Sequence, residues 1–583
     1  MRRTTLILLF GAALLQAQAP YTPAPESQPR ADSPKGTVTR GVLPPGKFYP
    51  GTPHNYSVYV PAQYEAAKPT PFMIFLDGGS NNVVFDNLIA KKEIPPMIGI
   101  FISPGVLPAI GNAQARAERI FEYDSINGRY AQFLVEEVIP EVAKKYNLSM
   151  DPSDRGLVGN STGAVGAFMA AWERPDQFRR VASFIGTFVA MKGADTLPAL
   201  IRKSEPKPIR IFMQDGRNDH LVPGQPYGTF FAGSWPINNQ ILYEDLQFAG
   251  YDVKYELGDA GHDGTQRAAI MPEVLRWLWR DYPKPILAQA PAALGKPGWD
   301  PRAQVFSTVA PEKPWEQVGG TYKSVVSPAP DKDGNVYFAD TAAGIIYKSD
   351  ADAKVTVFKS NVGGVTALRV GADGRLYAGQ PALKRIVSYG PGGDEKVAAH
   401  NVIANDLAVT IKGGVYYVDS AAKSVGFVDA TGKSRVVFRG DEMLLPAALT
   451  LSPDQAMLVV ADSRNKFNWS LQIAADDSLI NGEPFFRVDM PDISPYSGVT
   501  SVTVDSIGQV YFSTALGIQL CEQNGRCAAI LSKPELGNVT GFAFGGRDLN
   551  WIYATENGKL FRRFSLRTGV AAWALVKPPN PPL

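Results

Sequence analysis

Several residues that mark whole classes of protein are scarce in this chain. Its 583 residues include only two cysteines and four histidines, and the cysteines form no Cys-x-x-Cys pair. The cysteine count excludes zinc ribbons and iron–sulfur centres, which need several closely spaced thiolates. Any histidine-dependent chemistry must use His54, His220, His262 or His400.

The chain also lacks a strong net charge and a long apolar segment. Lys and Arg number 58 against 56 Asp and Glu, which gives a net charge of +2. A near-neutral chain has no bulk attraction to nucleic acid or to an acidic membrane, so we expect neither as a partner. Beyond the N-terminus no stretch reaches the ~18 apolar residues of a membrane-spanning helix, so no membrane span is expected.

The N-terminus carries the pattern of an export signal. Arg2 and Arg3 precede the apolar stretch Thr4 to Leu15, which is too short to span a membrane, and Ala17-Gln18-Ala19 is a small-x-small cleavage pattern. Residues 1–19 are therefore predicted to be a secretory signal peptide, followed by a Pro/Ala-rich linker over 20–35. We expect an exported protein, periplasmic or extracellular.

What is abundant indicates a large globular protein. Hydrophobic residues make up 45% of the chain and charged residues 20%, which is enough to bury sizeable cores. The 55 glycines and 47 prolines indicate many turns. The length favours two large domains or three smaller ones.

The first half alternates short apolar runs with helical patterns, which predicts a mostly parallel sheet with helices on both faces. This α/β pattern covers residues 36–283. The expected strands are Phe72–Leu76, Met97–Ser103, Arg155–Val158, Ile209–Gln214 and Val253–Leu257. The expected helices are Tyr130–Tyr146, Gly163–Trp172, Ile237–Phe248 and Pro272–Trp279.

The second half changes period after an Ala- and Pro-rich segment, which we interpret as a linker over 284–317. Six similar segments, such as GNVYFAD at Gly334 and GQVYFST at Gly508, recur at intervals of about 40–50 residues. Their aligned positions are Tyr337, Tyr377, Tyr416, Val459, Tyr511 and Tyr553. Regular repeats of several short strands predict an all-β six-bladed propeller over 318–583; a large irregular β-sandwich would not explain the spacing.

The two cysteines are placed for a disulfide in one hairpin. A three-residue loop Gln523–Gly525, with Gly525 left-handed, would pair Glu522 with Arg526 and set Cys521 opposite Cys527. Export would permit the bond. The alternative is two free thiols that are neighbours by chance.

Gly159-Asn160-Ser161-Thr162-Gly163 forms a G-x-S-x-G motif in a setting that suits a nucleophile. It follows the apolar strand that ends at Val158 and opens a helix of small residues. This strand–turn–helix context is the geometry of a nucleophile elbow, in which the serine Oγ stands exposed. We therefore predict Ser161 as the nucleophile rather than a serine in an ordinary glycine turn.

A serine nucleophile needs a base and an acid that orients it. His262 lies in the glycine-rich loop after Val253–Leu257, whereas His54 precedes the core strands and His400 lies in the propeller. Asp215 and Asp219 both follow Ile209–Gln214. Asp219 is favoured as the acid because it lies farther from the strand end, with Asp215 kept as the alternative. His220 adjoins Asp219 but would point away.

The oxyanion of an acyl-transfer reaction needs hydrogen-bond donors. Gly78 and Gly79 follow the strand Phe72–Leu76, and glycine allows the backbone to approach a substrate closely. The backbone amides of Gly78, Gly79 and Thr162 are the predicted donors. A tight turn without that role is the alternative for the glycines.

These residues carry a family resemblance over 36–283. The pieces FLDGG, VGNSTGAVGAF, QDGRND, GYDVKY and AGHDG resemble the esterase family of α/β-hydrolases that includes enterochelin esterases, feruloyl esterases and mycolyltransferases. The resemblance implies Ser161 as nucleophile, Asp219 as acid and His262 as base, with no cofactor. It does not identify the acyl group or the alcohol.

Residues from about 318 to 580 resemble the gluconolactonase and senescence-marker-protein family of six-bladed propellers. That resemblance implies one divalent metal held by a Glu, two Asn and an Asp. Here Asn405 matches one asparagine, but the other positions fall in a first-blade stretch without Glu, near Ala447 and near Thr500. We treat Asn405 as vestigial and expect no functional metal in the propeller.

The leading prediction is an exported serine carboxylic-ester hydrolase with an accessory propeller. Its substrate would be a small-molecule or carbohydrate-linked ester, or an aryl ester. Two alternatives stay open: a metal-dependent lactonase acting in the propeller, and a non-catalytic binding module. Oligomeric state is not predicted.

Overall fold

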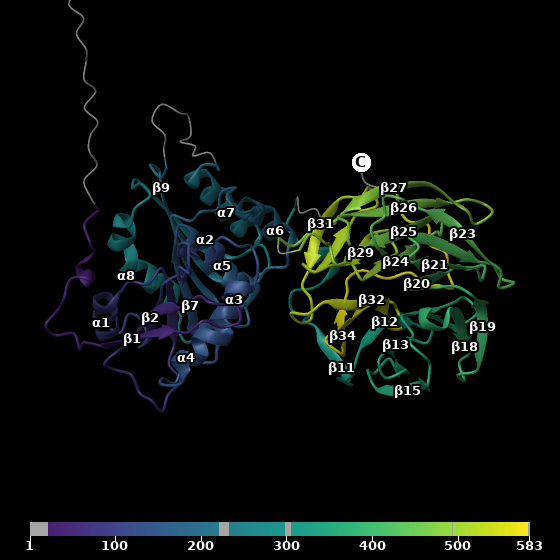
Figure 1. The fold of residues 1–583 in the computed structure, drawn as a ribbon, viewed down its shortest axis with the longest axis horizontal. Helices are drawn as coiled ribbons and strands as arrows, with labels where there is room; N and C mark the ends of the chain where they lie inside the picture. The colour runs from purple at the N-terminus through teal and green to yellow at the C-terminus, as the bar shows by residue number, and fades with distance from the viewer. Residues whose placement is uncertain (1–20, 221–231, 298–304, 493, 581–583) are drawn as a thin grey trace, which may run out of the picture. The chain divides into compact units, whose positions relative to one another are not determined.

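The computed structural model describes residues 21–220, 232–297, 305–492 and 494–580. The predicted signal peptide lies outside the described residues. Contacts divide the chain into two compact units, Met1–Leu197 with Pro208–Glu244 and Tyr251–Leu287, and Pro198–Lys207 with Asp245–Gly250 and Ala288–Leu583. Figure 1 labels helices and strands of both units. Among the described residues, no helix is long and apolar enough to cross a membrane.

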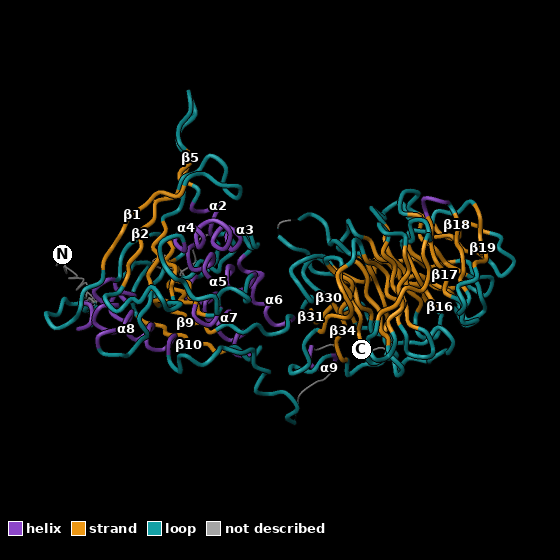
Figure 2. The backbone as a smooth tube through the Cα atoms, turned by 90° about the horizontal axis from the view of Figure 1, so that it is seen from below, coloured by secondary structure: helices purple, strands orange, loops and turns teal. Residues whose placement is uncertain are grey.

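The first unit is built on one eight-stranded sheet with the order β1-β2-β4-β3-β7-β8-β9-β10. β1 and β2 pair antiparallel, β2 pairs antiparallel with β4, and the remaining neighbours are parallel. Figure 2 shows helices on both sides of the sheet. The strands are β1 (Thr37–Leu43), β2 (His54–Val60), β3 (Phe72–Leu76), β4 (Ile98–Ile102), β7 (Arg155–Asn160), β8 (Arg180–Phe184), β9 (Arg210–Gly216) and β10 (Asp252–Gly258).

The helices of the chain are mostly short, with two long ones, α7 and α8, near the end of the sheet. A small hairpin, β5 (Val106–Leu107) with β6 (Arg116–Ala117), lies between β4 and α2. The α-helices are α1 (Asn82–Ala90), α2 (Arg119–Tyr123), α3 (Arg129–Phe133), α4 (Ile139–Ala143), α5 (Thr162–Glu173), α6 (Leu197–Lys203), α7 (Trp235–Phe248), α8 (Thr265–Trp279) and α9 (Val305–Thr308).

The predicted fold class is confirmed, and the five predicted strands are found as β3, β4, β7, β9 and β10. β1, β2 and β8 were not predicted. The helix expected over Tyr130–Tyr146 is divided into α3 and α4 by a π-helical turn, Leu134–Val138. Pro140, at the start of α4, has no N–H to continue a regular α-helical ladder. α8 begins at Thr265, earlier than expected, and contains Pro272.

The sheet is buried on one face by α1 and α8. The shared core includes Met73 and Phe75 from β3 and Leu275 and Leu278 from α8, all at most 1% exposed. A rigid, buried sheet fixes where its strands end, and the loops that follow β3, β7, β9 and β10 therefore have defined starting points.

The second unit contains six four-stranded antiparallel sheets, the blades of a propeller. The first strands of successive blades contact one another in a closed ring. The six positions aligned in the sequence all lie on the second strand of their blade. β11 precedes the first blade in sequence but pairs with β34. The first strand of the propeller therefore completes its last blade and closes the ring.

The blades are made of consecutive strands, except for the last. The strands are β11 (Glu316–Thr321), β12 (Val325–Pro330), β13 (Val336–Asp340), β14 (Ile345–Ser349), β15 (Val355–Ser360), β16 (Ala367–Val370), β17 (Leu376–Gln380), β18 (Arg385–Tyr389), β19 (Glu395–His400), β20 (Asp406–Val409), β21 (Val415–Asp419), β22 (Ser424–Val428), β23 (Ser434–Arg439), β24 (Pro446–Leu451), β25 (Met457–Asp462), β26 (Phe467–Ile473), β27 (Leu479–Arg487), β28 (Ser501–Val504), β29 (Val510–Ser513), β30 (Ile518–Cys521), β31 (Cys527–Leu531), β32 (Val539–Gly545), β33 (Trp551–Glu556) and β34 (Lys559–Phe564).

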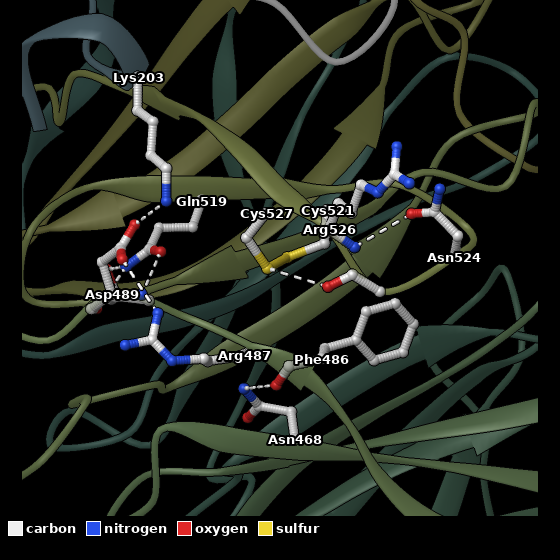
Figure 3. The surroundings of a disulfide bond; sticks show 12 residues. Lys203, Asn468, Phe486, Arg487, Asp489, Gln519, Cys521, Asn524, Arg526 and Cys527 are labelled. Atoms are coloured by element: carbon white, nitrogen blue, oxygen red, sulfur yellow. Dashed lines mark hydrogen bonds and ion pairs between the residues drawn. A yellow bond between two sulfur atoms is a disulfide. The ribbon is translucent and has the colours of Figure 1, made fainter. Parts of the chain in front are cut away.

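Cys521 and Cys527 are joined by a disulfide across the β30–β31 hairpin of the fifth blade. Glu522 and Arg526 pair through a 2.8 Å backbone hydrogen bond, and Gly525 has a φ of 88° in the loop between them. Figure 3 shows the S–S bond beside the turn that carries Asn524 and Arg526. The bond thus links the two strands next to their connecting turn.

Candidate active site

Ser161 lies on a strained turn between β7 and α5. Its φ is 55° and its ψ is −124°, a backbone conformation that a non-glycine residue rarely adopts. A Cβ at Gly159 would lie 1.9 Å from the Gly163 carbonyl oxygen, and one at Gly163 would lie 3.0 Å from an Asp77 oxygen. The glycines on both sides of Ser161 therefore allow the tight turn that projects the serine.

Ser161, His262 and Asp219 form a continuous hydrogen-bonded chain. His262 Nε2 lies 2.9 Å from Ser161 Oγ, and His262 Nδ1 lies 2.8 and 3.0 Å from the two oxygens of Asp219. Asp219 is fully buried, whereas the His262 side chain is 23% exposed. A buried carboxylate on one ring nitrogen fixes the tautomer that leaves the other nitrogen free to accept the serine proton.

Asp215, the alternative acid, lies behind Asp219 rather than against His262. Its Oδ1 accepts from the Gly216 amide at 2.8 Å and its Oδ2 accepts from Asn239 Nδ2 at 2.9 Å. Burial, and secondly a hydrogen bond with Asp219, raises the pKa of Asp215 well above its usual value. The Asp215 carboxyl therefore holds a proton more firmly than a free carboxyl does, and it contacts the acid of the triad rather than the imidazole.

A second hydrogen-bonded chain reaches Ser161 from its other side. Thr187 Oγ1 lies 3.1 Å from Ser161 Oγ, and Trp235 Nε1 donates to Thr187 Oγ1 at 3.3 Å. The Thr187 amide also donates to the Ser161 carbonyl at 3.2 Å. Thr187 and Trp235 are both buried, so these contacts are protected from water.

Two of the three predicted oxyanion donors have unused amides. The N–H groups of Gly79 and Thr162 donate to no residue in the described part of the chain. The Gly78 amide instead donates to the Ile102 carbonyl at 2.9 Å and extends the pairing of β3 with β4. The inclusion of Gly78 is therefore wrong, because its single proton is already used.

An ion pair ties the Gly78–Gly79 loop to the serine turn. Arg119 Nε and Nη2 donate to the two oxygens of Asp77 at 2.6 and 2.9 Å. The same guanidinium donates to the Asn160 carbonyl at 3.2 Å. Such a bidentate contact fixes orientation as well as distance, so Arg119 holds the loop after β3 against the end of β7.

The other histidines are placed differently from His262. His54 is buried and hydrogen-bonded to Glu122 Oε1 at 2.9 Å, a packing role. His400 ends β19 in the propeller. The His220 ring lies 4.0 Å from the His262 ring, and burial lowers the pKa of His220. Asp219, His220 and His262 are the one group among the described residues whose ligand atoms could converge on a metal ion. Asp219 and His262 already bond each other there.

The centre of the propeller does not fit the divalent cage that the resemblance implied. Asn405 Oδ1 accepts from the Ser420 amide at 3.0 Å, and the Thr500 hydroxyl bonds Ser513 Oγ at 2.9 Å and the Val539 carbonyl. Both oxygens thus bond groups of their own or neighbouring blades, and Ala447 offers no ligand atom. The oxygens of Asn405 and Thr500 are also uncharged, whereas a hard divalent cation prefers carboxylate ligands.

An ion pair lies among the inner strands instead. Arg369 Nη2 on β16 lies 3.1 Å from Asp406 Oδ2 on β20, and Arg369 Nη1 donates to Ser327 Oγ on β12 at 3.1 Å. Asp406 Oδ2 also accepts from the Leu449 amide on β24 at 3.0 Å. A guanidinium therefore supplies positive charge here, and the pair connects four inner strands.

Thr187, Trp235, Arg119 and Asp77 were not singled out from the sequence. Thr187 and Trp235 reach Ser161 from a loop after β8 and from the start of α7, and neither lies in a recognisable motif. Asp77 adjoins the glycines that were identified, and it shares their left-handed backbone, with φ of 68° beside 71° at Gly78 and 92° at Gly79. Only tertiary structure brings these side chains to the serine.

Comparisons with known proteins agree with this division. Residues 49–272 match the family model described as "Putative esterase", and residues 327–557 match the model of the SMP-30/Gluconolactonase/LRE-like region. A curated relative is the uncharacterized protein YbbA of Bacillus subtilis, 22% identical over 174 residues that cover 28% of this chain and 68% of YbbA.

Two solved structures are similar to parts of this chain. A gluconolactonase from Xanthomonas campestris is 15% identical, with 45% of this chain and 92% of that chain covered and a TM-score of 0.40. The enterobactin esterase of Shigella flexneri is 19% identical, with 45% of this chain and 64% of that chain covered and a TM-score of 0.35.

Proposed function

We propose that this carboxylic ester hydrolase, which joins an esterase-family domain to a gluconolactonase-like propeller, is an exported serine enzyme that acts through Ser161, His262 and Asp219. The observation that carries the proposal is the hydrogen-bonded chain from Ser161 Oγ through both nitrogens of His262 to Asp219. A serine hydroxyl is a weak nucleophile unless a base removes its proton, and this chain supplies the base and its orientation.

In this mechanism Ser161 Oγ attacks the ester carbonyl while His262 Nε2 takes the serine proton. The buried Asp219 stabilises the imidazolium that forms. The negative charge on the carbonyl oxygen is met by the free amides of Gly79 and Thr162. His262 then gives its proton to the leaving alcohol, which leaves an acyl-enzyme on Ser161. Water attacks the acyl carbonyl while His262 takes a water proton, and His262 returns that proton to Ser161 Oγ as the acid leaves. No metal or cofactor takes part.

The proposed substrate is a carbohydrate-linked or aryl ester. Export is supported by the sequence pattern of residues 1–19 and by a disulfide, which persists in oxidising compartments. The propeller is proposed to act as an accessory scaffold, because the side-chain oxygens of Asn405 and Thr500 are hydrogen-bonded within the blades.

The test is steady-state hydrolysis by the purified full chain. We expect turnover of a short panel, an aryl acetate, a feruloyl ester and an acetylated sugar, with turnover of at least one lost in Ser161→Ala. Hydrolysis of a lactone is measured in parallel with and without added calcium, zinc or manganese. Ester turnover that survives Ser161→Ala, or metal-stimulated lactone turnover abolished by Asn405→Ala, would refute the proposal.

A further inference from the structure

An open pocket of about 640 Å³ lies beside the Gly78–Gly79 loop. Its walls come from that loop, the start of α1, the first turns of α8 and the N-terminal segment at Pro23 and Ser27. Gly79, whose free amide is a proposed oxyanion donor, is one of its lining residues. A substrate held in the proposed active site can therefore extend into this pocket.

Arg267 is the cation of this pocket, and the carboxylate of Asp77 attracts it without pairing with it. No hydrogen bond or ion pair joins its guanidinium to any residue in the part of the chain that the structure describes. The other ionisable group in the wall is Asp77, and both Asp77 oxygens are taken by Arg119. Two guanidiniums, those of Arg119 and Arg267, thus share one carboxylate, and the net charge around the pocket is positive.

Arg267 is also partly withdrawn from water. Burial lowers the pKa of its guanidinium, and the guanidinium carbon lies 5.5 Å from the centre of the Phe184 ring. The Phe184 carbonyl accepts the hydrogen bond of the Ser161 amide at 2.9 Å, so Arg267 stands over the residue that anchors the serine. An unpaired cation in such a place is costly unless a ligand supplies the opposite charge.

Polar groups next to Arg267 are unsatisfied as well. Asn81 and Asn82 line the same pocket, and Asn81 Nδ2 and Asn82 Oδ1 are buried without a hydrogen-bond partner among the described residues. Together these groups offer a charged fork and a neutral donor, the pairing that recognises a carboxylate.

We infer that the substrate of the proposed esterase carries a carboxylate group, which Arg267 binds in this pocket while the ester carbonyl lies at Ser161. The inference rests on the proposed function and names its substrate class. Arg267 acts by binding the carboxylate and takes no part in bond making or breaking.

The experiment compares charged and neutral esters of matched shape. One pair carries the charge on the alcohol side, para-carboxyphenyl acetate against para-carbamoylphenyl acetate. The other carries it on the acyl side, the glutarate monoester of para-nitrophenol against its glutaramate. We expect kcat/KM to favour the charged member of at least one pair by about 10- to 100-fold, the range of a charge-assisted hydrogen bond. Added salt should reduce the preference.

Variants separate binding by Arg267 from general effects of charge or stability. Arg267→Gln should lose most of the charged-over-neutral ratio, and Arg267→Lys should keep part of it. Arg280→Gln is the matched control, since Arg280 caps the far end of α8, roughly 20 Å along the helix, and pairs with Asp252. It should keep the wild-type ratio.

Failure of this inference differs from failure of the proposed function. If neutral esters are hydrolysed and Ser161→Ala abolishes that, but neither pair shows a preference or Arg267→Gln keeps it, the carboxylate assignment is overturned. If no ester depends on Ser161, the proposed function fails first. Calorimetry on Ser161→Ala measures binding without turnover, with the charged ester of whichever pair shows the preference. Binding weakened at least tenfold by adding Arg267→Gln would support the inference, and binding that Arg267→Gln leaves unchanged would overturn it.

Discussion

Thr187 Oγ1 lies 3.1 Å from Ser161 Oγ, and the direction of this hydrogen bond follows from its neighbour. Trp235 Nε1 can only donate, and it donates to Thr187 Oγ1. The Thr187 proton is therefore free to point at Ser161 Oγ, which leaves the Ser161 proton directed at His262. Thr187 is thus a positioning residue that stabilises the negative charge developing on Oγ.

Replacing Thr187 by Val, which keeps the shape and removes the hydroxyl, should lower kcat by roughly 5- to 10-fold with little change in KM, the effect of one buried hydrogen bond. Thr187→Ser retains the hydroxyl and should restore most of the activity. Trp235→Phe removes only the donor behind Thr187 and should cost less. Steady-state kinetics of the three variants on one ester decide the point. Equal losses in Thr187→Val and Thr187→Ser would indicate a packing role instead.

The two carboxyl groups after β9 should respond differently to conversion to Asn. Asp219→Asn should lower kcat by about 10⁴-fold, because the amide favours the wrong imidazole tautomer. Asp215→Asn should cost far less, since His262 bonds Asp219 and Ser161 and has no hydrogen bond to Asp215 among the described residues. Asn cannot carry a negative charge. Comparable losses in kcat for the two variants would therefore show that turnover needs an ionised carboxylate at Asp215 as well.

Asp215 should also make stability depend on pH. Its pKa is raised in the fold, so the folded protein keeps a proton that the unfolded chain releases above about pH 4. Its contribution is complete below that pH and is lost as the pH rises. The free energy of unfolding of Asp215→Asn should therefore rise relative to that of the wild type, by up to ~1.4 kcal/mol per pH unit from about pH 4 upward. Thermal unfolding across this range is the measurement, and a constant difference would contradict it.

The Arg369–Asp406 pair should show strong coupling. Arg369→Met leaves a buried carboxyl without its cation and should destabilise the propeller by about 1–3 kcal/mol, whereas Arg369→Met with Asp406→Leu should cost less than the single change. Denaturant unfolding of the full chain, followed through its propeller transition, measures both. Additive losses would mean that the pair contributes no specific interaction.

Reduction of the Cys521–Cys527 bond should affect only the propeller. The closed loop is short, with a sequence separation of 6, so the stabilisation should be on the order of 2 kcal/mol. Cys521→Ser with Cys527→Ser should lower the propeller unfolding temperature by a few degrees and leave ester hydrolysis unchanged. Two thiols that alkylate without reductant in the exported protein would show that the bond does not form there.

Local patterns explain what could be predicted from the sequence. The turn at Ser161 needs glycine on both sides for steric reasons, and the loops after β9 and β10 can be identified by following the strands along the chain. Asp219 and His262 were therefore named in advance, and they lie within hydrogen-bond distance of each other. The propeller repeats were equally local, since each blade repeats one strand pattern.

Long-range contacts explain what could not. β8 begins at Arg180, the second of two adjacent arginines; such a charged pair is typical of a protein surface, yet Arg180 is fully buried. Its Nε donates to the Ser153 carbonyl at 2.7 Å, and its guanidinium lies 4.2 Å from the Trp279 ring. The occupied Gly78 amide and the unpaired Arg267 likewise depend on which strand or helix lies beside them, and no local pattern encodes that.

The most direct test of the account is covalent labelling of the intact protein with a fluorophosphonate, followed by mass mapping of the modified residue. We predict one adduct, on Ser161, that forms at least about 10³-fold more slowly in His262→Ala, because the serine then has no base. Labelling of Ser161 that proceeds equally fast in His262→Ala, or no labelling of Ser161 while the protein still hydrolyses esters, would contradict it.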